Sequence, residues 1–272
     1  MSDSRPIAER PDGRVWRQAL VPHEHGGWSF LAEPILLGLL VAFSTAGLLI
    51  SLAAVAAFLA RRPFRLLLSD RRRGKRYPRT LAAERGLAAC AIVGSLALAG
   101  GLLWARGSVL PAVGLAAPLA AAALAFDLGQ RSRELPAELT AALAIAATVS
   151  AIALSSGWRL APALGLWMVL AARDVPTVLY VRARLRMGRG QPAGVASALA
   201  AHAVALAFAA ALAGLRLVPW LAVAAVALLG LRAAYNLSAL RPSLSTPQLG
   251  LTEVVFGVTT VALVAVGVAL RL

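Results

Sequence analysis

Residues 86–104 have the sequence GLAACAIVGSLALAGGLLW, a run of nineteen residues without a charge. A helix of about 20 apolar residues crosses the hydrocarbon core of a bilayer, so this run predicts a membrane-spanning helix. The 25 residues before it, RRPFRLLLSDRRRGKRYPRTLAAER at 61–85, carry ten Arg and Lys residues against two acids. An apolar run beside such a basic connection is typical of a helix that ends on the cytoplasmic side of a membrane.

Apolar runs of this kind recur along the whole chain, whose 272 residues are 60% hydrophobic with a mean hydropathy of +0.76. Soluble domains have roughly 45–50% apolar residues. We therefore expect an all-α, polytopic membrane protein with about nine transmembrane helices in one bundle. Short links on one side of the membrane make consecutive helices antiparallel neighbours. The expected spans are residues 26–43, 46–59, 86–104, 108–126, 136–155, 160–181, 195–214, 217–235 and 249–270.

Basic residues are distributed unequally between the two sides of this topology. Of the 27 Lys and Arg residues, 23 fall on the N-terminal tail and the even-numbered connections, and only Arg106, Arg159, Arg216 and Arg271 fall on the other side. Because basic residues are retained in the cytoplasm, we expect a cytoplasmic tail at 1–22 and a single transmembrane domain at 23–272. The net charge of +15 then reflects topology and attraction to membrane lipids, which excludes nucleic-acid binding as its explanation.

The location that follows is a cell membrane, which the chain crosses several times. The first twenty residues contain no apolar segment, so no cleavable signal peptide is expected. Cys90 is the only cysteine, which excludes an internal disulfide and a paired-cysteine metal site. Lipids are the expected partners, and the sequence indicates no protein partner.

All twelve acidic residues and all three histidines lie on the basic side of this topology. An ionisable side chain inside a span is costly and faces a cavity or a partner. We therefore predict one polar, cytoplasm-facing chamber within the bundle. The candidate catalytic residues of this chamber are Glu33, Asp127, Glu138, Asp174 and Glu253.

Glu33 and Glu253 are the sharpest of these candidates. Glu33 lies about two turns inside the first span, directly before Pro34, and proline bends a spanning helix. Glu253 lies about one turn inside the last span. If the first and last helices pack together, the two carboxylates meet at one depth and need a proton, a metal ion or an arginine between them. The alternative for Glu33 is a structural pair with a buried arginine such as Arg173.

Asp127 and Glu138 bracket the connection between spans four and five. For these two carboxylates the alternative is simple pairing with Arg131 and Arg133 of that connection.

A second group of candidates would bind substrate. Arg173, Tyr180 and Arg182 surround Asp174 near the cytoplasmic end of the sixth span. Arginines around a tyrosine suit a phosphate or a carboxylate, and the alternative is a rim of arginines that extend to the membrane surface.

His23, Glu24 and His25 form the third group, and His25 is also a substrate-binding candidate. Two imidazoles and a carboxylate suit a divalent metal, which is the cofactor that this motif suggests. The alternative is a polar cap at the membrane surface, anchored by Trp28.

Three blocks of this chain resemble the YwiC-like family of bacterial membrane proteins. The resemblance implies a multi-pass protein of the inner membrane of a bacterial cell, but it implies little about activity. The three blocks are PHEHGGW at 22–28 with Glu33-Pro34, the segment 173–182, and LGLTEVVFG at 249–257. Nine helices with large inner loops after helices two and six are also similar to the UbiA superfamily of intramembrane prenyltransferases. Those enzymes hold a prenyl diphosphate through Mg²⁺ on Asp-rich motifs. Here the first loop contains only Asp70 and the second only Asp174, so that metal site is not carried over.

These observations leave three hypotheses for the function. The first, which we favour from the sequence, is a UbiA-like enzyme that acts on a lipid or isoprenoid substrate at the cytoplasmic leaflet. The second is a proton-coupled transporter in which Glu33 and Glu253 titrate, although no two-fold repeat is evident. The third is a metal- or haem-handling membrane protein that uses His23, His25 and His202.

Overall fold

The computed structural model describes residues 25–239 and 243–271, and within these ranges the chain forms helices and no strand. The all-α prediction is therefore confirmed. Eight of the helices are long and apolar enough to cross a membrane, and α2 is a shorter apolar helix. The helices are α2 (His25–Val41), α3 (Thr45–Arg72), α4 (Pro78–Leu103), α5 (Leu110–Leu128), α6 (Leu135–Ala146), α7 (Thr148–Ser155), α8 (Leu160–Met187), α9 (Val195–Gly214), α10 (Trp220–Leu237) and α11 (Thr246–Leu270). Helices α6 and α7 are two parts of one span.

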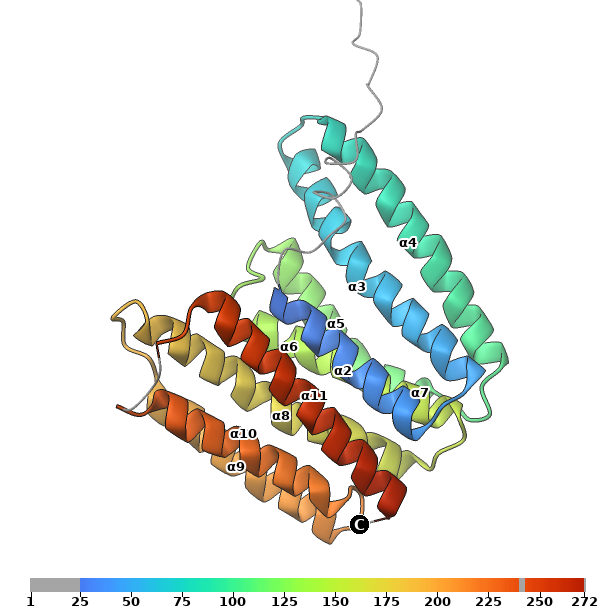
Figure 1. The fold of residues 1–272 in the computed structure, drawn as a ribbon. Coiled ribbons are helices and arrows are strands. Elements are labelled where there is room, and N and C mark those ends of the chain that lie inside the picture. Colours follow the sequence, from blue (N-terminus) through green and yellow to red (C-terminus); the bar gives the residue numbers. More distant parts are fainter. Residues whose placement is uncertain (1–24, 240–242, 272) are drawn as a thin grey trace, which may run out of the picture.

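Consecutive spans run antiparallel, so the connections alternate between the two ends of the bundle (Figure 1). One end of the bundle contains the start of α2 and the connections α3–α4, α5–α6 and α8–α9. We call it the basic end. The described basic residues of the opposite end are Arg106, Arg159, Arg216 and Arg271. The side of the predicted topology with many basic residues therefore corresponds to one end of the bundle, and the side with few corresponds to the other end.

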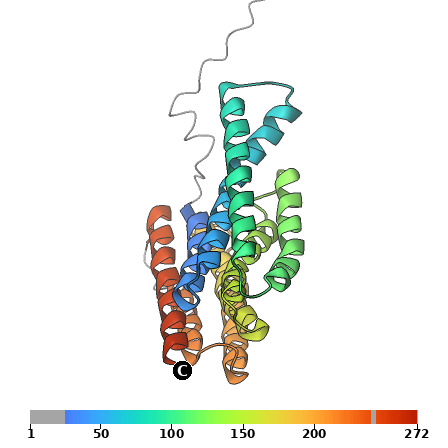
Figure 2. The same ribbon diagram turned by 90° about the vertical axis from the view of Figure 1, so that its right-hand side faces the viewer.

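The helices at the basic end are longer than the apolar runs predicted. Helix α3 continues through Arg61, Arg62 and Pro63 to Arg72, and α4 already begins at Pro78. The predicted connection at 61–85 is therefore mostly helical, because Arg and Lys are good helix formers once a helix leaves the apolar layer. Figures 1 and 2 show that the α3–α4 hairpin projects beyond the other helices at this end.

The hairpin is closed at its tip by buried polar contacts. Asp70, whose side chain is fully buried, accepts hydrogen bonds from the Thr80 hydroxyl at 2.8 Å and from the Arg79 guanidinium at 2.9 Å. The Thr80 hydroxyl in turn accepts from the backbone N–H of Tyr77 at 3.0 Å, which caps the start of α4.

The largest apolar core lies in the half of the bundle away from the basic end. It is built around α7 and the first half of α8, where Val149, Ile152, Leu166 and Leu170 are almost completely buried. The buried charged residues of α2, α8, α10 and α11 lie between this core and the basic end. The fold thus separates an apolar half from a half that contains buried charge.

Candidate functional site

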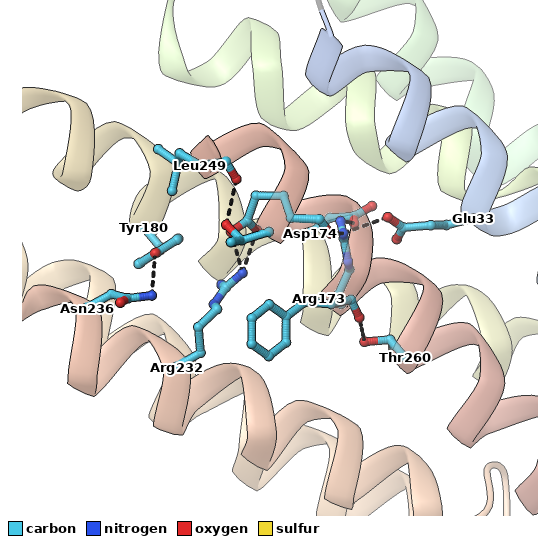
Figure 3. Close-up of polar contacts among 11 residues, drawn as sticks. Glu33, Arg173, Asp174, Tyr180, Arg232, Asn236, Leu249 and Thr260 are labelled. Atoms are coloured by element: carbon cyan, nitrogen blue, oxygen red, sulfur yellow. Dashed lines mark hydrogen bonds and ion pairs between the residues drawn. The ribbon is translucent and has the colours of Figure 1, made fainter. Parts of the chain in front are cut away.

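Five buried charged residues from four helices form the candidate site. Glu33 comes from α2, Arg173 and Asp174 from α8, Arg232 from α10 and Glu253 from α11, and each is at most 9% exposed. We call these five residues the central charge cluster. Figure 3 labels Glu33, Arg173, Asp174 and Arg232 of this cluster, which lie between the helices and take part in hydrogen bonds and ion pairs.

Arg173 connects three helices through one guanidinium group. Its Nη2 donates to Glu33 Oε1 at 2.6 Å and to the backbone carbonyl of Glu253 at 3.5 Å, while Nη1 donates to Asp174 Oδ1 at 3.0 Å. The guanidinium also lies over the ring of Phe30, 5.4 Å from its centroid. Arg173 is 1% exposed, so its ion pair with Glu33 is shielded from solvent. A buried ion pair is stable only when its geometry is good.

The close approach of Glu33 to α11 depends on Gly257. A Cβ atom at this position would lie 2.0 Å from Glu33 Oε1 and 2.8 Å from Arg173 Nη2. Such distances are far inside van der Waals contact, so only glycine allows the carboxylate and the guanidinium to meet against this helix.

Arg232 forms the second half of the cluster. Its Nη1 donates to both carboxylate oxygens of Glu253, at 2.6 Å for Oε1. The guanidinium carbon lies 4.2 Å from the centroid of the Tyr180 ring and 5.0 Å from that of Phe256, so two aromatic faces also stabilise its charge. The Tyr180 hydroxyl accepts from Asn236 Nδ2 at 3.0 Å (Figure 3).

The charges of this cluster do not balance. Glu33, Asp174 and Glu253 contribute three carboxylates, whereas Arg173 and Arg232 contribute two guanidiniums. Counted over these five groups alone, and with all of them ionised, the cluster has one carboxylate in excess, and excess charge in a buried position is energetically costly. One additional proton or monovalent cation makes it neutral.

The other candidate carboxylates lie in separate ion pairs. Asp127 accepts two hydrogen bonds from Arg61, at 2.7 and 3.1 Å, which connects α5 with α3. Glu138 accepts from Arg182 Nη1 at 2.8 Å, and the same nitrogen donates to the backbone carbonyl of Arg133 at 3.1 Å. The structure therefore brings Glu33, Asp174 and Glu253 together with Arg173 and places Tyr180 beside them.

Glu134 pairs with Arg131 on the surface of the α5–α6 connection, at 2.6 Å. The Glu134 carboxylate raises the pKa of the Arg131 guanidinium above its usual value. The alternative considered for Asp127 and Glu138 was pairing with Arg131 and Arg133, but these two carboxylates pair with Arg61 of α3 and Arg182 of α8.

Sequence reasoning missed two components of the site. Arg232 is one of the 23 basic residues counted with the tail and the even-numbered connections, although it lies within the expected span 217–235. An arginine inside an apolar span is a recognisable signal of a buried polar site. Gly257 gave no such signal, because its role depends on how close α2 and α11 approach. The alternative pairing of Glu33 with Arg173 is confirmed by the 2.6 Å ion pair.

The histidine candidates are only partly described. His23 and Glu24 lie outside the described residues, as does the side chain of His25. His202 is buried, its Nδ1 lies 2.8 Å from the carbonyl of Ala198, and its Nε2 has no partner among the described residues. Residues 25–239 and 243–271 contain no group of three potential metal ligands, so the metal site at 23–25 stays a prediction.

Comparison with known proteins supports one of the two resemblances in part. The sequence profile described as YwiC-like protein matches residues 21–153, which include PHEHGGW and Glu33-Pro34. The blocks at 173–182 and 249–257 lie beyond this match. No match was found among curated proteins, and none among solved structures. The resemblance to the UbiA superfamily therefore stays a prediction.

Proposed function

We propose that the chain is a proton-coupled membrane carrier whose proton site is the central charge cluster. The observation that supports this proposal is the excess of one carboxylate over the guanidiniums in a buried position. Burial makes the uncompensated charge costly, and a proton is the smallest species that removes it. A site that gains and loses one proton in this way is the central element of a proton-coupled carrier.

The same ion pairs provide a way to couple the proton to movement. Glu33 reaches from α2 to Arg173 of α8, and Glu253 reaches from α11 to Arg232 of α10. A proton on either carboxylate weakens the contact between two helices. Protonation would then shift the population between two packings of the bundle, as alternating access requires.

The proposed orientation places the basic end in the cytoplasm, in agreement with the retention of basic residues on that side. The N-terminus would then be inside the cell, and the membrane would be the inner membrane of a bacterium. We also propose that the whole chain, including the part beyond residue 153, is a YwiC-like protein.

The test uses purified protein in liposomes that contain a pH-sensitive dye. Inorganic phosphate, short carboxylates, sugars, amines and metal cations are added outside in turn. We expect one class of solute to change the internal pH with the wild-type protein, and Glu33→Gln to abolish this change. Glu134→Gln is the matched control, because Glu134 pairs with Arg131 on the surface.

Two outcomes would contradict the proposal. In the first, no solute class changes the internal pH above the rate of protein-free liposomes. In the second, Glu33→Gln and Glu134→Gln behave alike, which would show that the buried carboxylate does not take part.

An intramembrane transferase for a lipid or isoprenoid is the second candidate function. It is supported by a hollow of about 160 Å³ at the basic end, which Arg182 and Arg186 line. Mass spectrometry of lipids after incubation with a prenyl diphosphate would detect the product. The third hypothesis, metal or haem handling, depends on side chains at 23–25 outside the described residues.

A further inference from the structure

A hollow at the basic end lies where α8 ends and α9 begins, beside the start of α6. Its volume is about 160 Å³, far above the roughly 10–15 Å³ that one water requires. Leu135 and Leu179 contribute apolar walls, whereas Arg182, Arg186 and Ser197 contribute polar groups. The hollow is therefore large enough for a group of several atoms, with cationic and apolar surfaces side by side.

Arg182 and Arg186 have side-chain N–H groups that can donate hydrogen bonds to a ligand. They are four residues apart on α8, so they lie on one face of the helix. Both hydrogen bonds that the Arg182 side chain donates to described residues use Nη1, so Nε and Nη2 have no hydrogen-bond partner among residues 25–239 and 243–271. Arg186 is exposed and makes no side-chain hydrogen bond or ion pair with a described residue. Guanidinium groups recognise phosphate through paired, charge-assisted hydrogen bonds.

The start of α9 adds to this cationic surface. Gly194 has a φ of +66°, and no side chain caps the first turn that follows it. The Ser197 hydroxyl donates back to the carbonyl of Gly194 at 2.7 Å. The free N–H groups of the first turn therefore add partial positive charge to the wall that the two arginines already make cationic.

We propose that this hollow binds a phosphate group, carried either by a membrane lipid or by a free anion. Arg182 and Arg186 bind the phosphate oxygens, and Leu135 and Leu179 contact the adjacent apolar part when the ligand is a lipid. The site lies apart from the central charge cluster and does not depend on the proposed proton coupling.

The experiment uses the full-length protein in two arms. In the first arm, calorimetry measures the binding of inorganic phosphate to protein in a neutral detergent. In the second, native mass spectrometry counts phosphatidic acid retained from nanodiscs, with phosphatidylcholine as the reference lipid. Retention of phosphatidic acid alone identifies a lipid headgroup, whereas binding of inorganic phosphate identifies a free anion, and either result supports the site.

Three variants separate this site from general surface charge. We expect Arg186→Gln to weaken binding about tenfold, as the loss of a charge-assisted hydrogen bond does. Arg189→Gln, a change in the same connection outside the hollow, should change it by about twofold at most. Ala193→Leu fills the hollow without a change of charge and should also weaken binding. The proposal is overturned if neither ligand binds, or if Arg189→Gln weakens binding as much as Arg186→Gln.

Discussion

Gly257 is the residue at which the packing of the central charge cluster can be tested most directly. Gly257→Ala would force Glu33 away from Arg173, because the new Cβ would lie 2.0 Å from Glu33 Oε1. Breaking a buried ion pair costs about 3–5 kcal/mol. We expect the melting temperature in detergent to fall by roughly 5 °C or more.

Gly250→Ala is the matched control for this prediction. Gly250 lies on the same helix, α11, and a Cβ atom there would meet no atom within 4 Å. Replacement of an open helical glycine by alanine stabilises by up to about 1 kcal/mol. Equal melting temperatures for the two alanine variants would show that the approach of Glu33 to α11 does not stabilise the fold.

Single residues also show what the sequence could reveal about the site. Glu33 stood out because a carboxylate within an apolar run needs a partner, and Arg173 was considered as that partner. The contact of Arg232 with Glu253 was not predicted, because the hydrophobic pattern does not specify which faces of α10 and α11 meet. Geometry of this kind appears only when the helices are packed.

At the scale of elements, the α3–α4 hairpin depends on Asp70. Asp70→Asn removes the charge that holds Arg79 and weakens the bond to Thr80, so the tip should open more often. The tip contains Arg71, Arg72, Arg73, Lys75 and Arg76, which are sites for trypsin. We expect cleavage there to be about tenfold faster, which corresponds to roughly 1.4 kcal/mol of local stability.

Glu84→Gln is the control for the hairpin, because the ion pair of Glu84 with Arg76 is long and exposed. Glu84 lies 3.4 Å from an Arg76 side chain that is 86% exposed, and exposed pairs contribute little. If trypsin cleaves both variants at the wild-type rate, Asp70 does not hold the hairpin closed.

Element boundaries were harder to predict than the existence of the elements. Apolar length identifies a span, because about 20 residues must match the membrane. The end of a helix depends instead on capping, and a helix rich in arginine continues into water. Helices α3 and α8 therefore extend to Arg72 and Met187, well past the apolar runs predicted to end at 59 and 181.

For the whole molecule, the sequence predicted the all-α class and the alternation of charge between the two ends. It predicted an open polar chamber as well, and the structure shows the carboxylates Glu33, Asp174 and Glu253 in direct contact with guanidiniums. Composition places acids and bases at similar depth, but it does not distinguish a solvated cavity from a packed ion-pair network. That difference depends on distances of a few ångströms between helices.

Orientation is the prediction that belongs to the whole molecule. In a Cys90→Ala background, Lys75→Cys marks the exposed tip of the basic end, and Ser108→Cys marks the exposed α4–α5 connection at the opposite end. We expect a membrane-impermeant maleimide to label intact cells at Ser108→Cys only, because basic residues remain in the cytoplasm. Permeabilised cells should be labelled at both positions, which controls for reactivity. Labelling of intact cells at Lys75→Cys alone would place the basic end outside and would reverse the side from which the proposed proton and phosphate sites are reached.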